Sequence, residues 1–173
     1  MSRKTQTVGL IALCLVFTTS ILACGPKHPI EVQRAMFKLW HEAASNTLKL
    51  QGDVMLHTVE TLRLYGNGTL NSYEAYSAAS NARKTLVGMW ELAEPRIPKE
   101  LTPKHQALVK EAVAAFRQGE SLRAAAISSL MEFFDAPSPG KLSGYEGKVA
   151  EAGPHYVAGA EILGKIAKEL SPW

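Results

Sequence analysis

Histidines are the first residues to consider, because imidazole groups bind metals and haem and act as acids and bases near neutral pH. The chain has five, at His28, His41, His57, His105 and His155. None belongs to a His-Glu-x-x-His zinc motif, a Glu-x-x-His di-iron motif or a Cys-x-x-Cys-His haem-attachment motif. Non-covalent haem held by His41 or His57, with Met55 or Met89 opposite, is physically possible. We favour structural or surface histidines and expect neither a metal nor a cofactor.

Two polar residues, Gln51 and Thr58, occupy positions where a helical repeat calls for apolar side chains. Buried polar groups need hydrogen-bond partners, and Ser129 on a later helix is a candidate. One interpretation is a polar layer that fixes helix register, as a single polar core residue does in coiled coils. The other is a ligand pocket that Gln51 and Thr58 form together with His41 and His57. We favour the polar layer.

Nucleophilic catalysis finds little support in the residue pattern. The two cysteines, Cys14 and Cys24, both lie near the N-terminus, so the rest of the chain has no thiol for a disulfide, a metal or a nucleophile. Serine, histidine and acidic residues are present, but no motif brings them together. We therefore expect no catalytic residues and predict that the protein is not an enzyme.

The N-terminal region has the three zones of an export signal. Arg3 and Lys4 precede an apolar stretch over 8–22, and small residues then lead into Cys24. The stretch of 15 residues is shorter than the roughly 20 that a spanning helix needs. A transmembrane anchor is therefore the less favoured alternative to a cleaved signal.

The junction Ile21-Leu22-Ala23-Cys24 resembles the lipobox of bacterial lipoproteins. The resemblance implies cleavage between Ala23 and Cys24, a thioether-linked lipid on Cys24 and an N-acyl chain such as palmitate. Two or more acyl chains anchor a protein stably to a membrane. Gly25 stands where an Asp is the inner-membrane retention signal in many Gram-negative bacteria. The resemblance therefore favours the outer membrane, facing the periplasm, over the inner membrane.

The net charge of the chain indicates which classes of partner it binds. Without Arg3 and Lys4 the chain has 17 basic and 16 acidic side chains, a net charge of about +1. No basic run follows the leader, which argues against nucleic-acid binding. We expect a membrane contact through the lipid and a protein partner in the cell envelope.

Apolar periodicity predicts helices throughout the remaining chain. The first runs from Ile30 to about 65, with a bend possible at Gly52, and the second runs from about 72 to 94 after an Asn71–Glu74 capping box. A third begins at Pro103 after Thr102 and carries a strict 4-3 line from Leu108 to Phe133. The predicted inner line of the second helix is Tyr76, Ala79, Ala82, Leu86, Met89 and Ala93.

A capping box at Ser143 and Glu146 predicts the start of a fourth helix. Pro154 then causes either a kink or a new helix start, and Tyr156, Ala160, Leu163, Ala167 and Leu170 form the inner line. Four helices with short connections predict an all-α, up-down-up-down four-helix bundle. The expected organisation is a signal peptide over 1–23, a lipidated tether over 24–29 and the helical bundle domain over 30–173.

These features favour a lipid-anchored cell-envelope domain that acts as a protein-interaction or structural module. Aromatic side chains near helix ends, Phe133, Phe134 and Trp173, are candidate docking residues. A small-ligand or cofactor-binding bundle of the sensor type is the alternative function.

Overall fold

The structure, a computed structural model, describes residues 28–93 and 96–171. These residues form four long helices and no strand: α2 (Ile30–Gly66), α3 (Ser72–Ala93), α4 (Pro103–Asp135) and α5 (Pro139–Leu170). The all-α prediction is thus confirmed. The predicted signal peptide, Ala23, Cys24 and Trp173 lie outside the described residues. Among the described helices, none has the length and apolar character needed to span a membrane.

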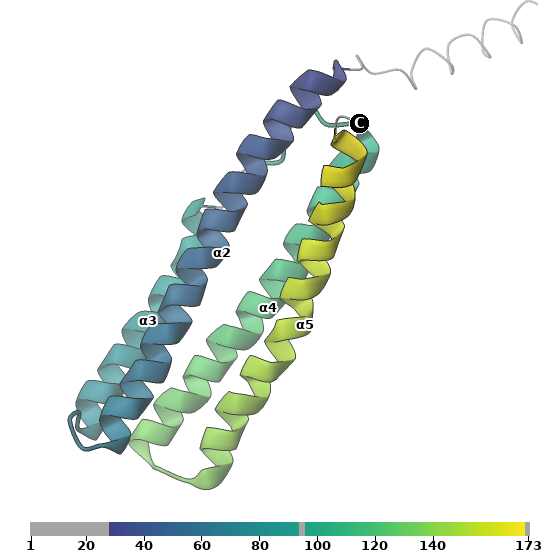
Figure 1. Cartoon of the computed structure of the whole chain (residues 1–173). Helices are drawn as coiled ribbons and strands as arrows, with labels where there is room; N and C mark the ends of the chain where they lie inside the picture. Colours follow the sequence, from purple (N-terminus) through teal and green to yellow (C-terminus); the bar gives the residue numbers. More distant parts are fainter. Residues whose placement is uncertain (1–27, 94–95, 172–173) are drawn as a thin grey trace, which may run out of the picture.

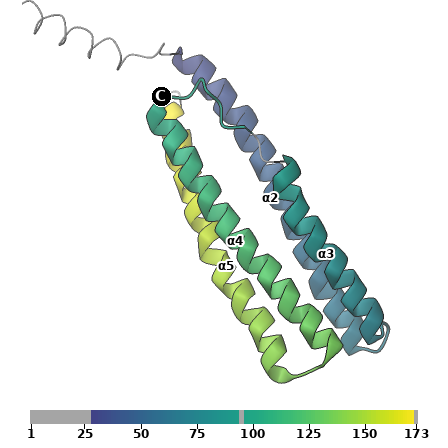
Figure 2. The same ribbon diagram turned by 180° about the vertical axis from the view of Figure 1, so that it is seen from behind.

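Helices that follow one another in the chain pack side by side (Figures 1 and 2). The most extensive contact joins α4 to α5, whereas α2 touches α5 at few places. The turns from α2 to α3 and from α4 to α5 lie at one end of the molecule, and the start of α2 and the end of α5 lie at the other (Figure 1). Because α3 has 22 residues and α2 has 37, α3 covers only part of α2.

Local signals begin two helices as the sequence predicted, and a glycine allows the turn after α2. Asn71 and Glu74 form a reciprocal capping box, with each backbone N–H donating to the other side chain at 2.9 and 3.0 Å. The Thr102 hydroxyl accepts from the backbone N–H of His105 at 3.2 Å, and Pro103 begins α4. The turn after α2 places Gly68 at a φ of 77°, a conformation that glycine adopts without steric cost.

The predicted start of the last helix is wrong. α5 begins at Pro139 instead of Ser143, whose hydroxyl donates to the carbonyl of Gly140 within the helix. Proline suits a first turn because its missing N–H is not needed there. Pro154 lies inside a continuous α5, so of the two alternatives predicted at this residue the new helix start is excluded. The long contact with α4 supports the helix on both sides of this proline.

The buried interior is divided into two apolar clusters. The cluster near the chain ends includes Phe37, Trp40, Val109, Phe116, Leu163, Ile166 and Leu170. The cluster near the two turns includes Met55, Leu86, Ile127, Leu130, Phe134 and Tyr145. Buried polar side chains of α2 and α4, including Gln51 and Glu120, lie among them.

Several residues predicted to face the core are exposed instead. Tyr76 is 39% exposed, and Ala160 and Ala167 of α5 lie on its outer side. On α2, Ala43 and Leu50 are exposed, although the neighbouring Ala44 and Gln51 are buried, so the buried stripe of this helix is narrow.

The α4–α5 contact contains two reciprocal insertions. The ring of Tyr156 on α5 lies over Gly119 of α4, and the ring of Phe116 on α4 lies over Gly159 of α5. The two ring centroids are 6.1 Å apart. The absence of a Cβ at each glycine therefore lets the helices approach closely.

Candidate functional site

Gln51 and Thr58, the two polar residues predicted to form a layer, are fully buried at 1% and 0% exposure. The Thr58 hydroxyl donates to the carbonyl of Met55 at 2.7 Å and lies 3.4 Å from the hydroxyl of Tyr145. The Gln51 Oε1 accepts from the Tyr156 hydroxyl at 3.4 Å, while its Nε2 has no partner among the described residues.

Ser129 is not the partner that the sequence suggested for this layer. Its hydroxyl accepts from the Lys148 Nζ at 2.6 Å and donates to the carbonyl of Ala125. The buried layer is therefore completed by the tyrosines of α5 instead of the serine of α4.

Charged groups lie beside Gln51, and we call Gln51, Glu120, Arg123 and Tyr156 the polar belt. The Arg123 guanidinium carbon is 3.9 Å from the centroid of the Tyr156 ring. Burial raises the pKa of the Tyr156 hydroxyl; the Glu120 charge adds to this rise, and Arg123 opposes it. Glu120 is only 8% exposed. The belt thus places a cation, an anion and a phenol in the half-buried middle of the bundle.

His41 and His57 do not join this layer, because both side chains are exposed on α2. The His41 ring packs against Phe37, with centroids 5.8 Å apart. His57 lines a surface hollow between α2 and α3. The four residues therefore do not form a single site. Within the described residues, no group of three or more His, Cys, Asp or Glu side chains is arranged to hold a metal ion.

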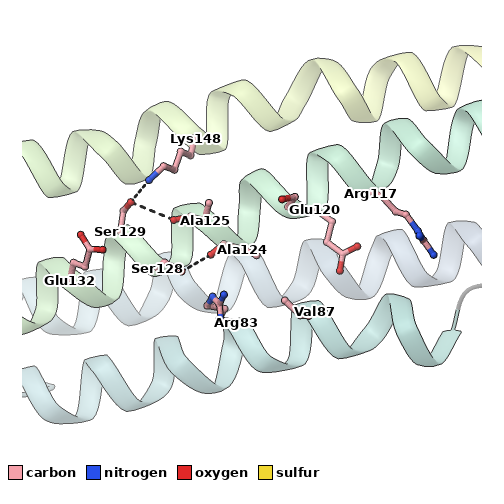
Figure 3. A pocket seen from close by; sticks show the side chains of 11 residues that line it. Arg83, Val87, Arg117, Glu120, Ala124, Ala125, Ser128, Ser129, Glu132 and Lys148 are labelled. Atoms are coloured by element: carbon pink, nitrogen blue, oxygen red, sulfur yellow. Dashed lines mark hydrogen bonds between the residues drawn. The ribbon is translucent and has the colours of Figure 1, made fainter.

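A surface hollow runs along α4, and we call it the α3–α4 groove (Figure 3). Its volume is about 610 Å³. The short side chains of Ser121, Ala125 and Ser128 follow one side of α4 at spacings of four and three, which leaves a low floor. Arg83 and Val87 of α3 line it on one side, and Lys148 of α5 reaches it from the other (Figure 3).

Charges of both signs surround this floor. Arg83, Arg117 and Lys148 are the cations, and Glu120 and Glu132 are the carboxylates. The Lys148 Nζ donates a hydrogen bond to the Ser129 hydroxyl. Neither Arg83 nor Glu132 has an ion-pair partner among the residues that the structure describes.

A second hollow of about 390 Å³ extends the groove toward the end of α4. It shares Arg83, Ser128 and Glu132 with the first hollow and adds Tyr76, Met131 and Asp135. From Arg117 to Asp135 the groove follows 19 residues of α4, and the 18 steps between them span roughly 27 Å at about 1.5 Å per residue. The surface therefore offers an elongated site with hydroxyls, both charges and one exposed aromatic ring.

The aromatic docking residues predicted near the end of α4 are placed differently. Phe134 is fully buried, and Phe133 is half-buried with its ring 5.9 Å from that of Tyr65. The α3–α4 groove was not predicted from the sequence. The small residues at 121, 125 and 128, on the side of the helix away from its 4-3 line, are the signal that could have indicated it.

Comparisons of the chain with protein-family models, curated proteins and solved structures found no match. The geometry described above is therefore the basis for a functional proposal.

Proposed function

We propose that this protein is a lipid-anchored cell-envelope module without enzymatic activity, which binds a segment of a partner protein in the α3–α4 groove. The observation that carries the proposal is the continuous groove from Arg117 to Asp135, with a floor of small side chains and charges of both signs at its sides. A groove about 27 Å long suits a polypeptide segment better than a small metabolite.

The charge pattern supports a polypeptide as the occupant. Arg83 is available for an acidic side chain of the partner, and Glu132 is available for a basic one. Opposite charges along a groove set the register and orientation of a bound segment more than they set its affinity. The exposed ring of Tyr76 supplies an aromatic contact, the kind of residue that often dominates binding energy at interfaces.

A photo-crosslinking amino acid placed at Ser121 tests this proposal in cells. We expect it to give one major adduct, and the same amino acid at exposed Lys165 on α5 to give none. Ala125→Trp fills the floor of the groove and should lower the adduct yield at least tenfold. Ala158→Trp on the exposed side of α5 is the matched control and should leave the yield unchanged. An adduct that persists in Ala125→Trp would show that the partner does not occupy the groove.

The lipid anchor is a separate part of the proposal, supported by the leader and the Ile21-Leu22-Ala23-Cys24 junction. Growth with an alkynyl fatty acid should label the protein, and Cys24→Ala should abolish the label and leave an unprocessed or mislocalised chain. Label retained in Cys24→Ala would contradict the lipoprotein assignment. Localisation to the outer membrane, facing the periplasm, is checked by membrane fractionation.

We also infer that the four helices form an up-down-up-down bundle. The short links between α2 and α3 and between α4 and α5, and the packing of helices that are neighbours in sequence, support this arrangement. Distances between spin labels at helix ends would test it. Labels at the start of α2 and the end of α5 should be close, and either of them should be far from the α4–α5 turn.

A further inference from the structure

A second groove, between α2 and α5, has a different character. Its volume is about 480 Å³, within the roughly 300–1,000 Å³ of small-molecule sites. Met55, Leu56, Val59 and Val149 supply apolar walls, and the sparse contact between α2 and α5 leaves the space between them open. Gly52 contributes no side chain to fill it.

The apolar walls of this α2–α5 groove are unusually accessible to solvent. Leu56 is 68% exposed and Val59 is 52% exposed, although they lie one turn apart on the same helix. Burial of each such side chain by a ligand is favourable in proportion to the apolar area that it removes from water. This apolar wall would suit many apolar ligands, so the polar residues of the groove are needed to indicate the chemical class of the ligand.

The polar residues give the groove a positive end. Arg123 and Lys49 line it together with a single carboxylate, that of Asp53. Arg123 is half-buried and lies over the Tyr156 ring, and it has no ion-pair partner among the described residues. Glu120 of the polar belt lines the α3–α4 groove instead of this one. A partly buried guanidinium is stabilised by an anion that accepts charge-assisted hydrogen bonds from it.

We propose that the α2–α5 groove binds a long-chain fatty acid, with its carboxylate at Arg123 and its hydrocarbon chain along Leu56, Val59 and Val149. An apolar wall beside the half-buried Arg123 guanidinium matches this ligand class, which has one negative end and an otherwise apolar body. A neutral alcohol of equal length lacks the charge, and a cationic amine has the wrong sign. The site is separate from the α3–α4 groove and does not depend on the protein partner proposed there.

The free energy of burying a hydrocarbon chain predicts how binding affinity should depend on the length of the ligand. Each fully buried methylene contributes roughly a fourfold increase in affinity. Affinity should therefore rise steeply from octanoate to dodecanoate, by less than the full-burial value for each added methylene because the groove is open on one side. A ligand held by its charge alone would show no such dependence on chain length.

The test uses the full-length chain in isolated membranes and a fatty-acid probe with a diazirine near its methyl end and an alkyne for detection. We expect saturable labelling that maps to the peptides holding Leu56, Val59 and Val149. Excess dodecanoate should reduce the labelling at least tenfold, and dodecan-1-ol or dodecylamine should reduce it less than threefold. Octanoate should compete more weakly than dodecanoate.

Two variants with matched controls complete the test. Leu56→Asp should reduce labelling at least fivefold, whereas Val157→Asp, on a similarly exposed side chain of α5, should not. Arg123→Met should remove the preference for dodecanoate over dodecan-1-ol, whereas Lys165→Met should retain it. Because Leu56 is exposed, its substitution tests the site even when Arg123→Met perturbs folding.

The proposal is overturned by labelling that maps outside these peptides, by equal competition from acid and alcohol, or by labelling unchanged in Leu56→Asp. Labelling unchanged in Leu56→Asp would leave the groove open to another occupant, such as a helix of a partner protein. A negative result for fatty-acid binding would not change the crosslinking result at Ser121, because the two experiments test different grooves.

Discussion

The substitution Gly159→Ala probes the close contact of α4 and α5 with a single methyl group. A Cβ at Gly159 would overlap the Phe116 ring, which is 2% exposed and has no free space to move into. Overpacking of this kind costs about 1–3 kcal/mol. The same substitution gains up to about 1 kcal/mol from the higher helix propensity of alanine. The net effect expected is a loss of stability.

Gly164→Ala on the same helix isolates the packing term, because a Cβ there meets nothing within 4 Å. Both variants share the gain in helix propensity, so their difference reports the overlap with Phe116 alone. Gly159→Ala should unfold about 1–3 kcal/mol more easily than Gly164→Ala. For a domain of this size the difference corresponds to roughly 2–4 °C in melting temperature for each kcal/mol.

Thermal unfolding followed by far-ultraviolet circular dichroism measures these differences. Gly119→Ala should lie between the other two variants, because the opposing Tyr156 ring is only half-buried and its edge, 2.6 Å from the new Cβ, has room to shift. A Gly159→Ala protein that melts at or above the temperature of Gly164→Ala would refute the proposed interdigitation.

Three further predictions concern polar groups. Hydrogen bonds from Lys104 and, second, from His105 lower the pKa of the Glu169 carboxyl, so its contribution to stability is present at neutral pH and is lost as the pH falls through this lowered pKa. The difference in melting temperature between wild type and Glu169→Gln should therefore shrink as the solution is acidified, and a constant difference would contradict the assignment. Gln51→Leu removes an unpartnered buried Nε2 and also the Oε1 that accepts a long, 3.4 Å hydrogen bond from Tyr156, so the two effects oppose each other. Unfolding in urea should show stability within about 1 kcal/mol of wild type, and a larger loss would mean that the amide contributes more than this one long hydrogen bond. Asn71→Ala should cost about 1 kcal/mol by removing the capping box, and no change in the urea midpoint would contradict its role.

The sequence predicted the helices well wherever a local signal ends or begins them. Two helix starts depend on residues within a single turn, Asn71 with Glu74 and Thr102 with Pro103. Their effect can therefore be predicted from residues that are close together in the sequence. At Pro154 the sequence left a kink and a new helix start as alternatives because the cost of proline is local, whereas the contact that supports a continuous α5 comes from α4.

The candidate sites were harder to predict, since each is assembled from different helices. Gln51 was correctly singled out as a polar residue on a buried line, yet its partner Tyr156 is 105 residues away and carries no local mark of that role. Arg83 and Lys148 reach the same groove from opposite sides of α4. A periodicity shows which side of a helix is apolar, but it does not show which neighbour lies across from it.

The length of α2 determines how far the binding surfaces stand from the end where the chain enters the bundle. At 1.5 Å per residue, its 37 residues extend about 55 Å. Residues 49–59, which line the α2–α5 groove, lie roughly 30–45 Å along that axis. If the proposed lipid tether holds the entry end and the bundle stands upright on the membrane, both grooves would lie well above the lipid headgroups. Ligands and partners would then reach them from the aqueous space instead of from the bilayer.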